Sequence, residues 1–313
     1  MRWSLLADGS LTLQVDPRLR SAMDPWVPLR CPALVAGATT AATIDVQCAS
    51  SPAPSLPGAP ATLRLGTVEA RVDDDRARVS LIGPSGVHGT VDLEERRAKI
   101  RSPDPTPEVA ADLYSMLTIA SAFLLGRLRR VLLHAAAVVP PAGDAWLLVG
   151  DARAGKTTTS LNLVTIGWDY CSDDQVVLSL EGDQSLAVEG WLRPFHVDAG
   201  WRAGRTSETR ESVEPSSVGP GGWQRRAALA GAVFLDLQPD SPTEVARLGK
   251  ADALAAIVRQ TPWLMADPVQ APAILALLIA AIQQPTVRLR LGRDTYRDAA
   301  RLLVCLQPIV GAA

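Results

Sequence analysis

The sequence is poor in aromatic residues, in cysteine pairs and in runs of like charge. Aromatic residues make up 4% of the 313 residues, so the 47% that is hydrophobic is mainly aliphatic, and it is enough for a sizeable core. The formal net charge is −2 without a long run of one sign, which argues against wholesale binding to nucleic acid or to an anionic membrane. The cysteines follow no zinc-ligand or CxxC spacing, so we expect ordinary buried or surface thiols at Cys31, Cys48, Cys171 and Cys305.

The sequence also lacks a hydrophobic run that is typical of a signal peptide or a membrane span. Residues 1–20 contain no apolar core of signal-peptide length, and the most apolar helical stretch, 113–125, is short and interrupted. We therefore expect a cytoplasmic protein that binds neither a membrane nor nucleic acid.

The length favours two domains. Residues 1–105 are rich in strand and turn patterns, and "TLRLGTVEARVDDDRARVSLIG" (62–83) alternates apolar and polar residues around an Asp-Asp-Asp turn, which predicts a hairpin. Residues 106–130 predict a connecting helix, because Thr106 can cap it and Pro107 fits its first turn. One face of this helix carries the apolar residues Val109, Leu113, Met116, Leu117, Ala120 and Leu124.

Residues 131–313 alternate between strand and helix patterns, which predicts a second, α/β domain. Strands are expected in "VLLHAAAVV" (131–139), "DAWLLVG" (144–150), both halves of "DYCSDDQVVLSL" (169–180), "LAGAVFLDLQ" (229–238) and "TVRLRLG" (286–292). Helices are expected in "KTTTSLNLVTIG" (156–167), "ADALAAIVRQ" (251–260), "APAILALLIAAIQQ" (271–284) and "DTYRDAARLLVCL" (294–306). The polar segment 199–226 is long for a structureless loop, so we expect a mobile lid or acceptor-binding loop, or else disorder. Arginines that gather around it could pair with phosphates or simply be solvated: Arg193, Arg202, Arg205, Arg225 and Arg226.

A phosphate-binding loop is predicted between the strand and the helix at 144–167. The motif G-x-x-x-x-G-K-[ST] is met by Gly150, Gly155, Lys156 and Thr157. Its backbone N–H groups would face a phosphate, Lys156 would reach the β/γ oxygens, and the Thr157 hydroxyl would ligate Mg²⁺. Arg153 could contact the nucleotide or face solvent at the crest of the loop, and we favour solvent. The expected nucleotide-binding residues are Gly150, Asp151, Ala152, Arg153, Ala154, Gly155, Lys156, Thr157 and Thr158.

Two carboxylates follow the loop at a spacing that suits a transfer reaction. Asp173 and Asp174 come 17 and 18 residues after Lys156, and adjacent residues of an extended segment point to opposite sides. One carboxylate could therefore face the metal and the other the acceptor, although an Asp-Asp pair is also common in solvated turns. His134 precedes the loop strand and is either a site residue or a core histidine, and His196 begins the polar segment.

The block from His134 to Leu178 resembles the HPr kinase family, in which an "LH" strand, a second strand, the loop, a helix and a "DD" pair follow at matching intervals. The resemblance implies an α/β kinase core, shared with phosphoenolpyruvate carboxykinases, and this chain would add a β-rich N-terminal domain. It implies that Asp173 is the catalytic base toward a serine hydroxyl, that Asp174 and Thr157 hold Mg²⁺, and that His134 and Lys156 serve the charged site. It also implies ATP as the donor.

The sequence departs from the family at two motifs, since the loop reads Gly-Asp-Ala-Arg-Ala-Gly-Lys-Thr and Ala135 follows the histidine where glycine is usual. The acceptor therefore stays open between serine of a peptide or protein and free serine. The first hypothesis is an ATP-dependent, Mg²⁺-requiring kinase, and the alternative is a nucleotide-gated binding protein without phosphotransfer. Whether the chain forms a homo-oligomer is left open.

Overall fold

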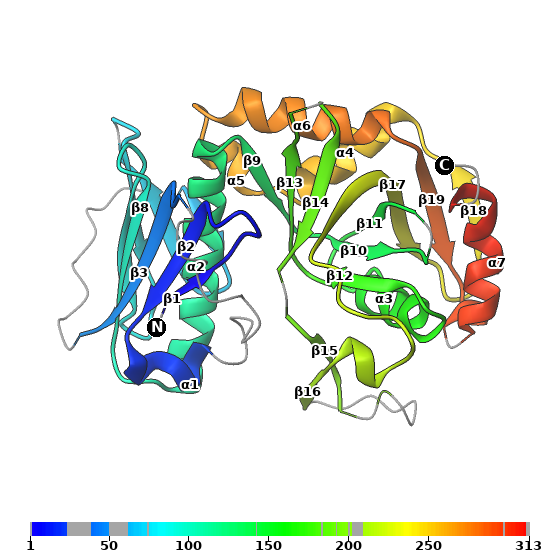
Figure 1. Cartoon of the computed structure of the whole chain (residues 1–313), viewed down its shortest axis with the longest axis horizontal. Helices are drawn as coiled ribbons and strands as arrows, with labels where there is room; N and C mark the ends of the chain where they lie inside the picture. The colour runs from blue at the N-terminus through cyan, green and yellow to red at the C-terminus, as the bar shows by residue number, and fades with distance from the viewer. Residues whose placement is uncertain are drawn as a thin grey trace. The chain divides into compact units, whose positions relative to one another are not determined.

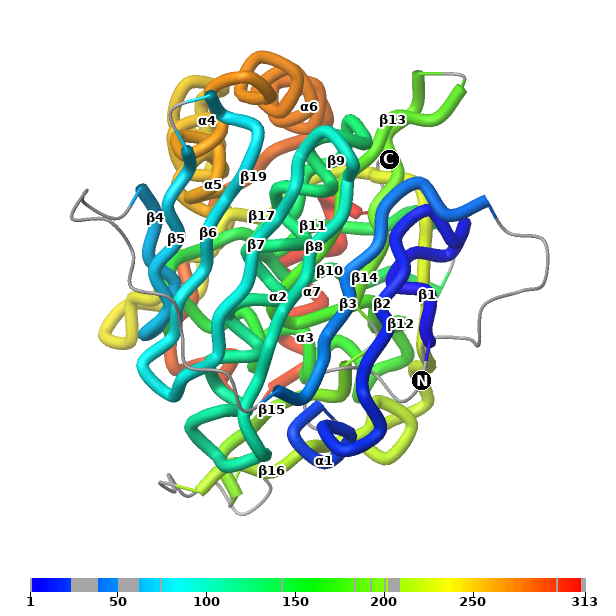
Figure 2. The backbone as a smooth tube through the Cα atoms, turned by 90° about the vertical axis from the view of Figure 1, so that its left-hand side faces the viewer, coloured from blue at the N-terminus to red at the C-terminus, as the bar shows by residue number. Residues whose placement is uncertain are grey.

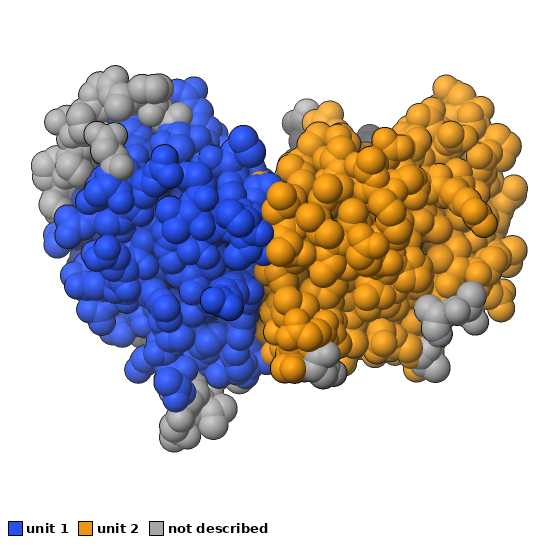
Figure 3. Space-filling model, turned by 90° about the horizontal axis from the view of Figure 1, so that it is seen from above, with its two compact units in different colours: residues 1–131, 262–274 blue, residues 132–261, 275–313 orange. Residues whose placement is uncertain are grey.

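The chain is a mixed α/β protein with several sheets, divided into two compact units (Figure 3). Our computed structural model describes residues 2–23, 39–49, 62–73, 75–141, 143–182, 184–191, 193–199, 201, 209–296 and 298–310. Unit 1 comprises residues 1–131 and 262–274, and unit 2 comprises residues 132–261 and 275–313. The helix α6 (Ala271–Gln283) and the strand β9 (Arg130–Leu133) each contain a boundary between the two sets of residues.

Unit 1 is built on one eight-stranded sheet in the order β1-β2-β3-β8-β7-β6-β5-β4. Its strands are β1 (Arg2–Ser4), β2 (Leu11–Val15), β3 (Ala42–Cys48), β4 (Leu63–Leu65), β5 (Val68–Val72), β6 (Arg78–Ile82), β7 (His88–Asp92) and β8 (Arg97–Ser102). The predicted hairpin is confirmed, because β5 and β6 pair antiparallel with Val72 opposite Val79. Strand β8 alternates exposed and buried side chains along its whole length, which is the pattern of a strand with one face on a core.

The long helix α2 (Pro107–Arg127) packs against this sheet and contacts β3, β5, β7 and β8 (Figure 2). The predicted cap is confirmed, since the Thr106 hydroxyl accepts a hydrogen bond from the Val109 N–H at 3.3 Å. More than the predicted apolar face is buried, because Ser115, Thr118 and Ser121 are buried as well. By length and composition α2 could cross a membrane, but 83% of its most apolar window is buried inside the protein, as in a core helix.

The remaining elements of unit 1 are short: the 3₁₀ turn η1 (Pro17–Leu19) and the helices α1 (Arg20–Met23) and α5 (Trp263–Ala266). The sequence predicted 106–130 as a separate connecting segment and placed 262–274 in the C-terminal domain. The structure instead groups both with residues 1–105, because α2 lies in the core of unit 1 and the Arg127 guanidinium pairs with Asp267 at 3.0 Å. Such a pairing between residues 140 positions apart has no local sequence signal.

Unit 2 contains a nine-stranded sheet in the order β12-β10-β11-β17-β14-β13-β9, and β19 pairs with β17 on a branch that β18 completes (Figure 1). Its strands are β10 (Ala136–Val139), β11 (Ala145–Val149), β12 (Asp169–Ser172), β13 (Val176–Leu180), β14 (Leu186–Gly190), β17 (Arg226–Leu237), β18 (Glu244–Arg247) and β19 (Thr286–Leu291). The helices are α3 (Lys156–Thr165), α4 (Lys250–Arg259) and α7 (Ala299–Val310), with 3₁₀ turns η3 (Pro215–Ser217) and η4 (Arg293–Thr295). Strands β11, β17 and β19 run parallel, so their C-terminal ends lie at one edge of the sheet.

The predicted strand at 131–139 is wrong in one respect, because it is two strands that break at His134 and Ala135. Strand β9 pairs with β13, whereas β10 pairs with β11 and β12. At the break the His134 N–H donates to the carbonyl of Gln260 at 3.0 Å, and the Ala135 N–H donates back to Leu133. The apolar run hid this break, since periodicity cannot show where a buried strand changes partners.

The described part of the polar segment 199–226 contains regular structure, and its predicted role as a lid or acceptor-binding loop stays a prediction. Strand β16 (Arg210–Val213) pairs antiparallel with β15 (Phe195–Asp198), and the Tyr170 backbone bonds to Gly222 and Gln224. The ring of Trp223 lies 5.1 Å from that of Tyr170 in an edge-on contact. Residues 200 and 202–208, including Arg202 and Arg205, lie outside the described residues.

Candidate active site

The predicted phosphate loop lies at the C-terminal end of β11. All five residues of this strand are buried, and the chain then turns through 150–155 into α3. Gly155, at the N-cap of α3, has φ 97°, and Arg153 has φ 66°. Because glycine adopts positive φ without strain and carries no side chain, it leaves the first amides of α3 accessible to an anion.

Gly150 is required by close packing rather than by its dihedral angles. A Cβ atom at this position would lie 2.8 Å from the Cβ of Ala154 and 3.2 Å from the carbonyl oxygen of Leu235. The Ala154 N–H donates to the Asp151 carbonyl at 3.1 Å, so the loop is a tight turn pressed against β17. The glycine at the start of the motif is therefore explained by the space that the turn leaves.

Lys156 folds back over this loop and is buried. Its Nζ donates to the carbonyls of Gly150 at 2.7 Å and Asp151 at 3.1 Å. Burial lowers the pKa of Lys156, while the negative charges of Asp174, Asp151 and Asp173 act in the opposite direction. The lysine therefore lies within electrostatic range of both carboxylates that the spacing predicted.

Asp173 is buried directly after β12. Its Oδ1 accepts a hydrogen bond from the Tyr170 hydroxyl at 2.9 Å. Burial raises the pKa of Asp173 and Asp174 raises it further, whereas Arg193 and hydrogen bonds from Tyr170 and Thr157 act to lower it. The hydroxyl predicted to ligate magnesium thus contacts this carboxylate in the structure.

Asp174 has different neighbours from Asp173, as expected for adjacent residues. Its Oδ2 accepts a hydrogen bond from Arg193 Nη1 at 2.9 Å, and its Oδ1 lies 3.6 Å from His134 Nε2. Burial and the charge of Lys156 lower the pKa of His134, and Asp174 and Asp151 act to raise it. Lys156, His134 and the two carboxylates are therefore gathered in one cluster.

Two further residues hold this cluster together: Gln260, which the sequence did not single out, and Arg193, which was predicted to pair with phosphates or to be solvated. Gln260, at the end of α4, donates from Nε2 to Asp151 Oδ1 at 2.8 Å and accepts the His134 N–H through its carbonyl. Arg193 is buried, binds Asp174 through its side chain, and accepts the Tyr170 hydroxyl at its carbonyl at 3.0 Å. No local motif predicts the bonds of Gln260 to Asp151 and of Arg193 to Asp174.

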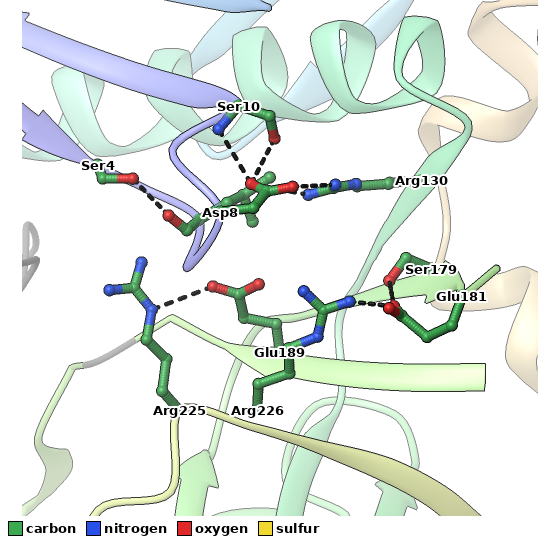
Figure 4. Close-up of polar contacts among 10 residues, drawn as sticks. Ser4, Asp8, Ser10, Arg130, Ser179, Glu181, Glu189, Arg225 and Arg226 are labelled. Carbon is green, nitrogen blue, oxygen red and sulfur yellow. Dashed lines mark hydrogen bonds and ion pairs between the residues drawn. The ribbon is translucent and has the colours of Figure 1, made fainter. Parts of the chain in front are cut away.

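The other basic residues of the predicted cluster have partners of their own. Arg225 binds Glu189 at 3.1 Å, and Arg226 binds Glu181 (Figure 4). His196, on β15, lies within electrostatic range of Arg193 and Asp174, and burial lowers its pKa. Arg153 is exposed at the loop crest, as predicted.

Two cavities adjoin the loop. The larger, of about 360 Å³, lies at Gly150 and Asp151 and is lined by charged side chains of both signs, Asp151, Asp236, Asp252, Arg259 and Arg288. The smaller, of about 140 Å³, lies on the other part of the motif, at Gly155 and Thr158. Both are formed within unit 2.

Metal binding at this cluster depends on the ligands that its side chains offer. Among the described residues no group of three or more His, Cys, Asp or Glu side chains is arranged to hold an ion. Magnesium differs from metals that need such a cage, because it takes one or two carboxylates, retains waters and shares phosphate oxygens. Thr157 and the carboxylates beside the loop fit that kind of site.

No family model matches this chain, and no curated protein does. Among solved structures, the chain is similar to the HPr(Ser) kinase/phosphatase from Coxiella burnetii, with 20% sequence identity and a TM-score of 0.26. The match covers 35% of this chain and 60% of that one, so the chain spans about three fifths of the protein that it matches. A likeness this weak carries no functional argument.

Proposed function

We propose that unit 2 is an ATP-dependent, magnesium-requiring kinase that transfers the γ-phosphoryl group to a serine hydroxyl. The observation that carries the proposal is the gathering of Lys156, Asp173 and Asp174 at the end of a glycine-bounded loop that leads into a helix. Each of these parts has a defined task in phosphoryl transfer. The proposed fold of unit 2 is the kinase core of the HPr kinase family, which the motifs between His134 and Leu178 resemble.

The nucleotide phosphates would lie on the loop. The amides of residues 151–153 and 155–158 would donate to phosphate oxygens, while that of Ala154 keeps its bond to Asp151. Lys156 would exchange its bonds to the Gly150 and Asp151 carbonyls for bonds to the β/γ oxygens. Thr157 and Asp174 would hold magnesium, which neutralises charge on the phosphate oxygens when it is bound. Arg193 fixes the orientation of Asp174 through its bond to Oδ2.

Asp173 would act as the general base. As the acceptor oxygen bonds to the γ-phosphorus, the bond from that phosphorus to the β–γ bridging oxygen breaks, the hydroxyl proton passes to Asp173, and ADP leaves. The position of Asp173 supports this role, because its carboxylate is buried beside the hydroxyl of Thr157 and within electrostatic range of Lys156. His134 and Asp174 would orient the charged groups around it.

The acceptor would approach through the larger cavity. Asp151 lines this cavity and also lies within electrostatic range of Lys156 and His134, which links the cavity to the cluster. A lining with carboxylates and guanidinium groups suits a polar acceptor, either serine in a peptide or free serine.

Phosphorus NMR of the protein with MgATP tests the proposal. Free serine and peptides with internal or C-terminal serine are offered as acceptors, and a phosphoserine signal is expected with one of them. The variant Asp240→Asn serves as the control, because Asp240 is 93% exposed and lies in the same unit. Retention of ATP with every acceptor, together with protection of the fold by ATP, would favour the nucleotide-gated binding protein instead.

A further inference from the structure

The smaller cavity begins at the phosphate loop and continues away from it. Its near wall is formed by Arg153, Gly155, Thr158 and Asn162, and its far wall by the ends of β17 and β19 and the turn η4. At about 140 Å³ it is too small for a whole ligand of ordinary size, which needs roughly 300 Å³ or more, but it can take one ring system.

The cavity and the carboxylates lie on different sides of α3. Thr157, Leu161 and Val164 share one face of the helix, where Thr157 bonds to Asp173 and the other two pack against Tyr170. Thr158 and Asn162, four residues apart, share another face and line the cavity.

The order of the strands locates the cavity relative to the loop strand. Asp173 and Asp174 lie between β12 and β13, so their position comes from the bond of Asp173 to Thr157 on α3. The cavity is closed by Leu237 and Leu291, the last residues of β17 and β19 on the side of β11 away from β10. A triphosphate whose γ-phosphorus faces Asp173 and whose chain crosses the amides at Gly155 therefore has its nucleoside end at the cavity.

The lining has the chemistry of a stacking site. Tyr296 is 56% exposed and Leu237 is 46% exposed, so an aromatic and an aliphatic surface border the opening. Asn162 holds the turn that carries Tyr296, since its amide nitrogen donates to the carbonyls of Thr295 and Tyr296, each at 3.3 Å. No Asp or Glu side chain belongs to the described lining, so the carboxylate that would select guanine through its N–H groups is not part of it.

We propose that this cavity is the nucleobase subsite of the donor, in which a purine ring stacks on Tyr296 with little discrimination between adenine and guanine. The inference rests on the proposed function, because it takes the loop as the site of the triphosphate. It adds which residues contact the base and how far the site distinguishes ATP from GTP. The loop motif specifies neither.

Calorimetric titration with three probes tests it: MgATP, MgGTP and magnesium tripolyphosphate, which has no base. The unmodified protein is expected to bind both nucleotides at least about 10-fold more tightly than tripolyphosphate, as stacking of one base commonly contributes. Tyr296→Ala is expected to weaken both nucleotides about 10-fold and to leave tripolyphosphate unchanged, whereas Tyr296→Phe retains the ring and the affinity. Leu237→Ala provides a second variant, with a loss of several-fold for the nucleotides alone.

The control is Val304→Ala on α7, because Val304 is 66% exposed and is not part of the lining. Equal affinity of the unmodified protein for ATP and tripolyphosphate, or an equal loss of both in Tyr296→Ala, would overturn the subsite while the phosphate site stands. A preference of more than about 100-fold between ATP and GTP would overturn the stacking account. Failure of all three probes to bind would overturn the proposed function and the subsite together.

Discussion

The tight packing at Gly150 allows a quantitative test of the phosphate loop. In Gly150→Ala the new Cβ would lie 2.8 Å from the Cβ of Ala154 and 3.2 Å from the Leu235 carbonyl oxygen. Neither neighbour is the end of a flexible side chain, so the loop itself must move. Overpacking of this kind costs about 1–3 kcal/mol. MgATP would bind the loop in its original geometry, so this cost should appear as a loss of affinity. Since about 1.4 kcal/mol is a factor of ten, MgATP should bind about 5- to 150-fold more weakly.

A second substitution should relieve the same contact. Ala154→Gly removes the nearest atom and leaves the contact of 3.2 Å with the Leu235 carbonyl oxygen, so the relief is partial. The double variant Gly150→Ala/Ala154→Gly should therefore bind MgATP more tightly than Gly150→Ala alone, although the added glycine costs about 0.5–1 kcal/mol in loop flexibility. Calorimetric affinities and urea unfolding would be measured for all three variants.

The matched control is Gly182→Ala, where an added Cβ meets nothing within 4 Å. It should bind MgATP as the unmodified protein does. If Gly150→Ala bound MgATP with unchanged affinity, or if Ala154→Gly restored none of the loss, the steric reasoning about this loop would be refuted.

Two further predictions concern unit 1. Asp112 is buried and accepts hydrogen bonds from the Thr67 hydroxyl at 2.6 Å and from Ser85 N–H at 2.9 Å, so Asp112→Ala should lower the free energy of unfolding by about 2–3 kcal/mol. A Cβ at Gly83 would collide with Asp112 Oδ2, so Gly83→Ala should lower the free energy of unfolding by less in the Asp112→Ala background. Hydrogen exchange of α2 amides measures both losses, and strictly additive losses would contradict this contact. Burial tends to raise the pKa of Asp8, but hydrogen bonds from Arg130 and Ser10 outweigh it and hold the pKa below 3.8 (Figure 4). The ionised form therefore stabilises the fold above pH 3.8. Asp8→Asn should lower the free energy of unfolding, measured with urea at about pH 7, by about 0.2–1 kcal/mol. The difference should shrink as the pH falls below about 4, and a difference that grew on acidification would contradict the assignment.

The sequence predicted the parts of the site that depend on local pattern. Residues 145–165 predict the loop, because a buried strand, a segment bounded by two glycines and a helix follow one another. The structure has β11 and α3 at these positions. The spacing from Lys156 to Asp173 and Asp174 also predicted their proximity, because one helix and one strand connect them. The catalytic, nucleotide and metal roles of these residues stay predictions.

The parts that the sequence did not predict depend on tertiary contacts. Gln260 and Asp151 form a hydrogen bond although they are 109 positions apart in the sequence. Arg193, between β14 and β15, binds Asp174, which lies between β12 and β13. Glutamine and arginine are common residue types, and neither of these two residues belongs to a motif. No local feature of the sequence therefore distinguishes their contacts from those of other polar residues. The sequence did not predict the break at His134 for a similar reason. The break depends on distant partners, since β9 pairs with β13 and the His134 N–H bonds to Gln260.

The central claim is that the cluster transfers a phosphoryl group and does more than bind a nucleotide. Asp173→Asn keeps the size of the side chain and removes the proton acceptor, so single-turnover transfer from MgATP and the dissociation constant of MgATP should be measured on the same variant. The account predicts a transfer rate lower by about 10²–10⁴-fold, with the dissociation constant changed by less than about threefold. A transfer rate equal to that of the unmodified protein would contradict the account.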